Sequence, residues 1–220
     1  PDLTVPIARL VATKFPACGI KRLFYIQNSY AAAEPAIGKA GEFTQAGIEL
    51  IGDASCAADA EVIALAVRAL QTAGLRAFTI DIGQVAYFKV LVSGLELDEV
   101  QTDALRRAVD SKNVVEIEAR TSRLGITGRR KEQLLALPNL FGGAEVFDKA
   151  LALSDEEGCR EAVENLKNVY SLLTEYGLAE YISIDFGMLH DIAYYSGIIF
   201  RGLTPEICFP VVSGGRYDDL

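Results

Sequence analysis

The sequence has few of the residues that build metal centres and covalent cross-links. It contains no tryptophan, one methionine and one histidine, His190. The four cysteines are far apart and form no CxxC pair; they are Cys18, Cys56, Cys159 and Cys208. A structural zinc site needs about four Cys or His ligands at short spacings, and a disulfide framework needs densely spaced cysteines. The sequence therefore predicts neither a metal site nor a disulfide framework.

Long apolar runs and an excess of positive charge are also missing. No stretch approaches the roughly 18 apolar residues of a membrane-spanning helix, and no basic and then apolar leader opens the chain. Lys and Arg total 21 against 30 Asp and Glu, so the formal net charge is -9. A nucleic-acid binder depends on a basic surface that neutralises phosphates. We expect no membrane and no nucleic-acid partner, and a cytoplasmic location.

Glycine-rich phosphate-binding motifs are absent as well. Neither GxGxxG nor GxxxxGKS/T occurs, so the sequence predicts no nucleotide cofactor of those types. The chain begins at Pro1 rather than at Met, and its last residues, Gly-Arg-Tyr-Asp-Asp-Leu, read as the middle of a domain. We therefore expect a fragment of a longer protein.

What is present is typical of a folded protein. The 220 residues are 50% hydrophobic and 23% charged, which suits one large domain or one domain with a smaller one inserted. β-Branched, aromatic and alternating patterns predict strands at residues 21–30, 42–51, 76–82, 181–186, 194–201 and 207–212. Helical spacing predicts a helix at 57–73 between Ser55 and Gly74, another at 155–176 before Gly177, and several short helices between them.

These elements predict an α+β fold. An antiparallel sheet with flanking helices is interrupted by a helical insertion and then completed by more strands. We place the sheet domain at residues 1–83 and 180–220, and the insertion at residues 84–179.

Two polar residues share one face of a predicted strand. Side chains alternate along residues 42–51, so Gln45 and Glu49 lie on the same side, with Gly47 between them. The glycine would let a small ligand approach the backbone, and the carboxylate could hold an amino group. The alternative is that this face is simply the solvent side of the sheet, because half-exposed antiparallel sheets are common.

Two further segments carry groups that could bind a ligand. Tyr194 and Tyr195 would point to opposite faces of their predicted strand, although tyrosines are often core residues. The run Ser213–Asp218 could bring backbone donors and Arg216 to an anion, or form a turn between strands. His190 and the basic run 129–131 are more simply explained as a structural residue and a solvated helix start.

Four segments together resemble the catalytic core of histidyl-tRNA synthetases, which have a class II aminoacyl-tRNA synthetase fold. They are Pro-Asp-Leu-Thr at 1–4, Glu-Phe-Thr-Gln-Ala-Gly-Ile-Glu at 42–49, Ala-Tyr-Tyr-Ser-Gly-Ile-Ile-Phe at 193–200 and Ser-Gly-Gly-Arg-Tyr-Asp at 213–218. Their order and spacing match over nearly the whole chain. Two kinds of protein share this core: the synthetase, and its paralogue, the regulatory subunit of ATP phosphoribosyltransferase.

Departures from the synthetase pattern favour the regulatory kind. In a synthetase the strand matching 23–30 leads into an arginine that grips the ATP α-phosphate, but here Tyr30 is followed by alanines at 31–33. The arginine of an Arg-Gly-Leu-Asp segment is also replaced, because this chain reads His-Asp-Ile-Ala at 190–193. Losing a preorganised donor of this kind typically costs several kcal/mol of barrier. The resemblance thus implies a non-catalytic chain.

The amino-acid pocket of the family is retained in outline. By resemblance, Asp2 and Thr4 contact the amino group of histidine, Gln45 and Glu49 hold the α-amino end, and Tyr194 and Tyr195 lie near the imidazole. Asp2 is one methylene shorter than the usual Glu. The implied partner is a short-form ATP phosphoribosyltransferase catalytic subunit, in a hetero-octamer in which this chain also pairs with itself and histidine is the effector.

Other interpretations remain open at this point. One is a divergent histidyl-tRNA synthetase that activates histidine with ATP. Another is a stand-alone amino-acid sensor of a different pathway, and a third is an assembly scaffold with a vestigial pocket.

Overall fold

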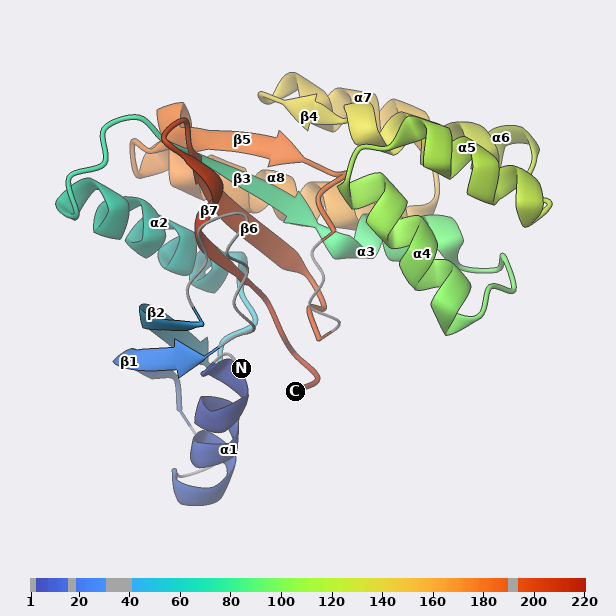
Figure 1. The fold of residues 1–220 in the computed structure, drawn as a ribbon. Coiled ribbons are helices and arrows are strands. Elements are labelled where there is room, and N and C mark those ends of the chain that lie inside the picture. Colours follow the sequence, from blue (N-terminus) through green and yellow to red (C-terminus); the bar gives the residue numbers. More distant parts are fainter. Residues whose placement is uncertain (1–2, 16–18, 31–40, 190–193) are drawn as a thin grey trace.

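The computed structural model describes residues 3–15, 19–30, 41–189 and 194–220, and its strands form two sheets (Figure 1). The first sheet is the antiparallel pair of β1 (Lys21–Tyr30) and β2 (Glu42–Ile51). The second has five strands in the order β4-β5-β3-β6-β7. These strands are β3 (Thr79–Gln84), β4 (Phe141–Gly142), β5 (Ile182–Asp185), β6 (Ile198–Thr204) and β7 (Ile207–Gly215).

The helices form a layer on the five-stranded sheet and a separate group at one end of it. They are α1 (Thr4–Lys14), α2 (Cys56–Thr72), α3 (Val85–Val92), α4 (Glu99–Asp110), α5 (Val114–Arg123), α6 (Gly128–Ala136), α7 (Glu145–Leu153) and α8 (Glu157–Glu175), with short 3-10 helices η2 (Leu137–Asn139) and η3 (Ala179–Tyr181). The long helices α2 and α8 pack against each other, and α8 also contacts α3 and β3. In Figure 1, α4 to α7 gather at one end of this sheet, far from α1 and the β1–β2 pair.

The termini of the two long helices follow from their sequence. The Ser55 hydroxyl accepts a hydrogen bond from the Ala58 N–H and caps α2, and Gly74 takes a positive φ of 93° after its last turn. Gly177 has a φ of 72° after α8. The predicted helices at 57–73 and 155–176 are therefore confirmed to within two residues at each end.

One hydrophobic core runs through the sheet and the helical segment. It includes Ile80 and Ile82 of β3, Val67 of α2 and Leu166 of α8, together with Leu105 of α4, all 0% exposed. The strands thus bury one face against α2 and α8, as an α+β fold requires. The division between residues 84–179 and the flanking segments stays a prediction, because residues from both contribute to this core.

Several elements differ from the sequence-based prediction. Helix α1, which the sequence did not predict, has no side-chain N-cap and buries no residue, so no capping residue marks its start. Strand β6 begins at Ile198, four residues after Tyr194. Strands β3 and β5 pair in parallel, because the helices between them allow the long crossover that a parallel pair needs.

Among the described residues, no helix is long and apolar enough to cross a membrane.

Candidate functional site

The register of β1 and β2 places the predicted polar pair on one face. Gln45 and Glu49 lie opposite Gln27 and Leu23, and Gly47 lies opposite Tyr25. The shared face of Gln45 and Glu49 is as expected from strand alternation. The space over Gly47 is not free, however: a Cβ at this position would overlap the Tyr25 ring. The glycine makes room for this ring rather than for a ligand, which corrects the sequence-based interpretation.

Glu49 is the carboxylate around which the site is built. It is 7% exposed, and its Oε1 accepts a hydrogen bond of 2.8 Å from the Thr4 hydroxyl of α1. Its Oε2 accepts a short hydrogen bond from the Tyr217 hydroxyl, which follows β7. Burial, and then the bond to Glu49, raises the pKa of Tyr217, so this phenol remains a donor. The hydroxyl of Thr4 on α1 and that of Tyr217 after β7 therefore hold the buried carboxylate of Glu49 on β2.

Gln45 is held by the neighbouring strand. Its Oε1 accepts a hydrogen bond of 3.0 Å from the hydroxyl of Ser29, which is buried on β1. This contact leaves the amide nitrogen of Gln45 as the end of the side chain that can donate to another group. Gln45 and Glu49 thus present a donor and an acceptor from one strand face.

The two adjacent tyrosines lie together instead of on opposite faces. The rings of Tyr194 and Tyr195 are 5.2 Å apart between centroids, and the ring of Tyr194 is 6.1 Å from that of Tyr217. Both residues precede β6, so strand alternation does not apply to them. Tyr195 is buried in a small apolar cluster with Met188 and Ile199. The prediction that one tyrosine faces away from the other was wrong for this reason.

These groups open onto one cavity of about 890 Å³. The predicted site residues that line it are Thr4, Gln45, Glu49, Tyr194 and Tyr195, and Tyr217 joins them. Asp2, the remaining predicted contact, lies outside the described residues, as do His190 and Ala31. Tyr217 was not predicted as a site residue, because only the backbone and the arginine of the Ser213–Asp218 run suggested a ligand contact. The sequence alone does not place the Tyr217 phenol beside Tyr194, because the two residues are not neighbours along the chain.

The charge of the cavity wall is mainly negative. Its described lining includes four carboxylates, Glu49, Asp53, Asp59 and Asp218, and one basic side chain, Arg216. Negative charge that is partly shielded from water favours a bound ammonium group and opposes a polyphosphate. On charge alone, this wall is suited to a ligand with an amino group.

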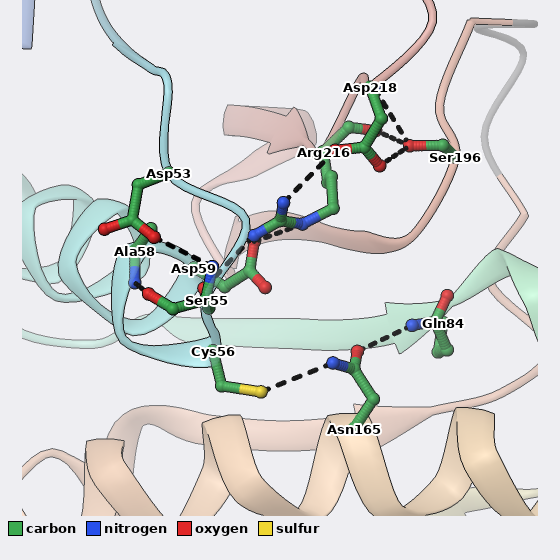
Figure 2. Close-up of polar contacts among 10 residues, drawn as sticks. All are labelled: Asp53, Ser55, Cys56, Ala58, Asp59, Gln84, Asn165, Ser196, Arg216 and Asp218. Atoms are coloured by element: carbon green, nitrogen blue, oxygen red, sulfur yellow. Dashed lines mark hydrogen bonds and ion pairs between the residues drawn. The ribbon is translucent and has the colours of Figure 1, made fainter. Parts of the chain in front are cut away.

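Figure 2 shows that Arg216 is engaged within the protein. Its Nη2 lies 3.0 Å from Asp59 Oδ1, its Nη1 lies 3.2 Å from Asp218 Oδ1, and its Nη2 also donates to the Ser55 carbonyl at 3.1 Å. Ser196 donates a short hydrogen bond to the other oxygen of Asp218. Burial raises the pKa of Asp59 in spite of Arg216. The run 213–218 is therefore neither an anion loop nor a simple turn: it ends β7 and fastens it to the start of α2.

A second group of contacts in Figure 2 ties α2 to α8 and to the end of β3. Asn165 of α8 donates to Cys56 Sγ at 3.3 Å and accepts a hydrogen bond of 2.8 Å from Gln84 Nε2. Gln84 in turn caps α3 by accepting from the Ala86 N–H. Helix α2, which carries Asp59, is thus held at its first turn from both sides.

Comparisons with known proteins find relatives that match the whole chain. A curated ATP phosphoribosyltransferase regulatory subunit of Thermoanaerobacter pseudethanolicus is 43% identical over all of this chain and 58% of its own length. A solved ATP phosphoribosyltransferase regulatory subunit/histidyl-tRNA synthetase from Bacillus halodurans is 38% identical, with a TM-score of 0.89 over 100% of this chain and 57% of that one. A chain of the ATP phosphoribosyl transferase (HisG:HisZ) complex from Thermotoga maritima shares the fold at 18% identity, with a TM-score of 0.75 over 98% and 74%.

The chain spans somewhat more than half the length of the curated relatives that it matches. The similar solved structures confirm the predicted α+β fold of the synthetase type. The family model for histidyl-tRNA synthetase matches residues 1–220, which is the whole chain. The chain belongs to the histidyl-tRNA synthetase family.

Proposed function

We propose that this chain is the synthetase-like part of an ATP phosphoribosyltransferase regulatory subunit. In this role it catalyses nothing itself and works with a short catalytic subunit in the first step of histidine biosynthesis. Relatives that carry this name are 43% identical over the whole chain. A hetero-octamer, pairing between copies of this chain and a cytoplasmic location belong to the same proposal.

The charge of the cavity carries the proposal. Amino-acid activation needs cations that neutralise the triphosphate of ATP and the charge that develops in adenylate formation. The one basic side chain in the described wall, Arg216, already contacts Asp59 and Asp218. The buried carboxylate of Glu49, in contrast, is held ready by Thr4 and Tyr217. The described part of the wall therefore supports an amino acid, rather than ATP, as the ligand of this cavity.

The sequence supports the same distinction at two positions. Alanines follow Tyr30 where a synthetase has its first catalytic arginine, and His190 stands where the second is expected. Both positions lie outside the described residues, so this support comes from the sequence alone.

Histidine is the ligand that we propose for the cavity. Thr4, Gln45 and Glu49 would hold its amino group, with Gln45 accepting through the second lone pair of Oε1. Tyr194 and Tyr195 would contact its imidazole, with Asp2 as a further contact. For histidine to act as a feedback effector, it must bind one conformation of the complex more tightly than another, because equal affinity for both shifts nothing.

The test is a calorimetric titration of histidine into the full-length protein, with Glu49→Gln as the variant. We expect binding to the wild type and its loss in the variant, because a neutral amide lacks the charge that pairs with an ammonium group. The catalytic subunit is then assayed with and without the regulatory protein and histidine, and its activity should respond to both. Histidine-dependent exchange between ATP and pyrophosphate by the wild-type protein would overturn the proposal.

A further inference from the structure

The C-terminal end of α4 contacts residues 185–189, the segment that lies just before Tyr194 and Tyr195 in the sequence. Lys112, which follows α4, forms an ion pair of 2.5 Å with Asp185 at the end of β5. Asp110, the last residue of α4, accepts a hydrogen bond of 2.8 Å from the Leu189 N–H. Arg106 of α4 lies 3.5 Å from the Leu189 carbonyl. One helix end therefore holds both ends of the segment 185–189, which is far from it in sequence.

The geometry of this contact is costly by local criteria. Lys112 has a φ of 55°, in the left-handed region that non-glycine residues seldom occupy. Asp110 places a negative charge at a helix C-terminus, where the helix dipole disfavours it. The φ of Lys112 also ends α4, because the Lys112 and Asn113 N–H groups donate to the Val109 and Ala108 carbonyls. The turn thereby brings the Lys112 side chain to Asp185, and the charge of Asp110 is stabilised by the Leu189 N–H.

Residues 185–189 are closely packed. Asp185 is 4% exposed, and its Oδ1 also accepts a hydrogen bond of 2.9 Å from the Gly187 N–H. A Cβ on Gly187 would lie 2.6 Å from Lys112 Nζ and 2.8 Å from the Leu137 carbonyl, so only glycine fits beside the ion pair. The position of residues 185–189 is thus set by the α4 end with little freedom.

The segment is in turn packed against the pocket. Met188 is fully buried in one apolar cluster with Val85, Tyr195 and Ile199, and Tyr194 and Tyr217 pack on this cluster. Lys89 of α3 donates to the Tyr195 carbonyl at 3.1 Å. A displacement of residues 185–189 would therefore shift Met188 and the tyrosine rings that pack around it, because close-packed groups transmit small movements.

We infer that Lys112 and Asp110 are positioning residues for the pocket: the α4 end clamps residues 185–189 and so sets the orientation of Tyr194 and Tyr195. This inference rests on the proposed function for the identity of the ligand. It makes the helical segment, and not only the sheet that carries Glu49, a determinant of affinity for histidine. It also gives a route by which a partner on the helical segment could alter the pocket.

The test uses the full-length protein with three substitutions at the clamp and one matched control. Lys112→Met breaks the ion pair. Asp110→Ala removes the acceptor for Leu189, whereas Asp110→Asn keeps a carbonyl oxygen in its place. The control, Lys131→Met, breaks a 2.6 Å ion pair with Glu118 in the same helical segment, and Lys131 is similar to Lys112 in exposure. Thermal unfolding is measured for each variant to check that it folds.

We expect Lys112→Met and Asp110→Ala to weaken histidine binding about fivefold or more, the scale of typical coupling between sites. Asp110→Asn should restore most of the affinity, and Lys131→Met should leave it unchanged. Hydrogen exchange of the Gly187 and Leu189 amides, measured without histidine, should accelerate in the first two variants and not in the control.

The two readouts separate the clamp from the proposed function. If the wild type does not bind histidine, the proposed function fails, while the exchange of Gly187 and Leu189 still tests the clamp. If histidine binds and the clamp variants bind it as tightly as the control does, the inference is overturned. Unchanged exchange at both amides would overturn it as well.

Discussion

Hydrogen bonds stabilise the buried carboxylate of Glu49 and leave it able to attract a cationic ligand. A carboxylate that is removed from water must be hydrogen-bonded, or its burial costs several kcal/mol. Glu49 accepts one hydrogen bond from the Thr4 hydroxyl and one from the Tyr217 hydroxyl, and these two residues lie near opposite ends of the chain. The two neutral donors stabilise the charge without cancelling it, so the carboxylate keeps its attraction for a cationic ligand.

The substitution Tyr217→Phe removes one of these donors and should be destabilising. We expect a loss of about 1 to 3 kcal/mol in the free energy of unfolding, because a buried charged acceptor loses a partner. Histidine binding should also weaken, since Glu49 loses the contact that orients it. Denaturant unfolding and calorimetry measure the two effects. Tyr176→Phe, at a tyrosine that is 46% exposed, is the control, and equal effects of the two substitutions would contradict this account.

The substitution Gly47→Ala tests the contact between β1 and β2. The new methyl group would overlap the Tyr25 ring, so we expect a loss of about 1 to 3 kcal/mol from overpacking. Combining Gly47→Ala with Tyr25→Ala should cost less than the sum of the two single changes, because the second removes the group that the first displaces. Denaturant unfolding of all four proteins measures this. Strict additivity would show that Tyr25 does not cover Gly47.

At the residue scale, the sequence predicted which strand face a side chain lies on better than it predicted the residues that contact that side chain. Alternation along β2 correctly placed Gln45 and Glu49 on one face, because it depends only on local strand geometry. The same rule failed for Tyr194 and Tyr195, which precede β6. The cover of Gly47 by Tyr25 depends on the register between two strands, which neither strand specifies alone.

At the scale of elements, the basic run at the start of α6 joins helices and is not merely solvated. Arg130 pairs with Glu156 through two contacts, of 2.7 and 3.2 Å, just before α8 begins. Arg129 pairs with Asp155, although both side chains are largely exposed. Pairs this exposed contribute little, whereas a bidentate arginine contact has the geometry that gives a measurable gain.

Glu156→Gln should therefore show a pH-dependent loss of stability. The hydrogen bond from Arg130 lowers the pKa of Glu156 below its value in the unfolded chain, so the folded state binds its proton less tightly. The pair's contribution is present above the unfolded pKa of about 4.3 and is lost as the pH falls through the folded pKa. We expect a difference from wild type of up to about 1 kcal/mol at neutral pH that shrinks at acidic pH, in unfolding curves recorded across that range. Glu132→Gln on α6 is the control, and a difference that grows at acidic pH would contradict the prediction.

Elements with strong local signals were predicted correctly, and those that depend on distant contacts were not. Capping residues and apolar spacing marked α2 and α8, both long enough for the periodicity to be clear. The parallel pairing of β3 with β5 depends on the path of about a hundred intervening residues, so neither strand's sequence specifies it. Helix α1 begins without a side-chain cap and buries no residue, although Ala8, Val11 and Ala12 line the cavity.

At the scale of the whole molecule, charge is the property that most narrows the choice of ligand. The net charge is -9, and the described wall of the cavity follows the same sign with four carboxylates and one internally paired arginine. A protein field of this kind raises the local concentration of cations and lowers that of anions. The amino group of a bound amino acid should thus contribute more to affinity than its carboxylate does.

Analogues of histidine that lack one charged group test this directly. Histidine at about 100 times its dissociation constant should stabilise the folded protein by about 2.7 kcal/mol, which is measurable as a rise in the unfolding temperature. Histidinol, which has the amine and no carboxylate, should keep most of this rise. Imidazolepropionate, which has the carboxylate and no amine, should lose it, because it offers Glu49 no ammonium group and the described wall offers no unpaired cation. The reverse order would mean that the carboxylate is the group recognised, and that a cation outside the described residues dominates the pocket.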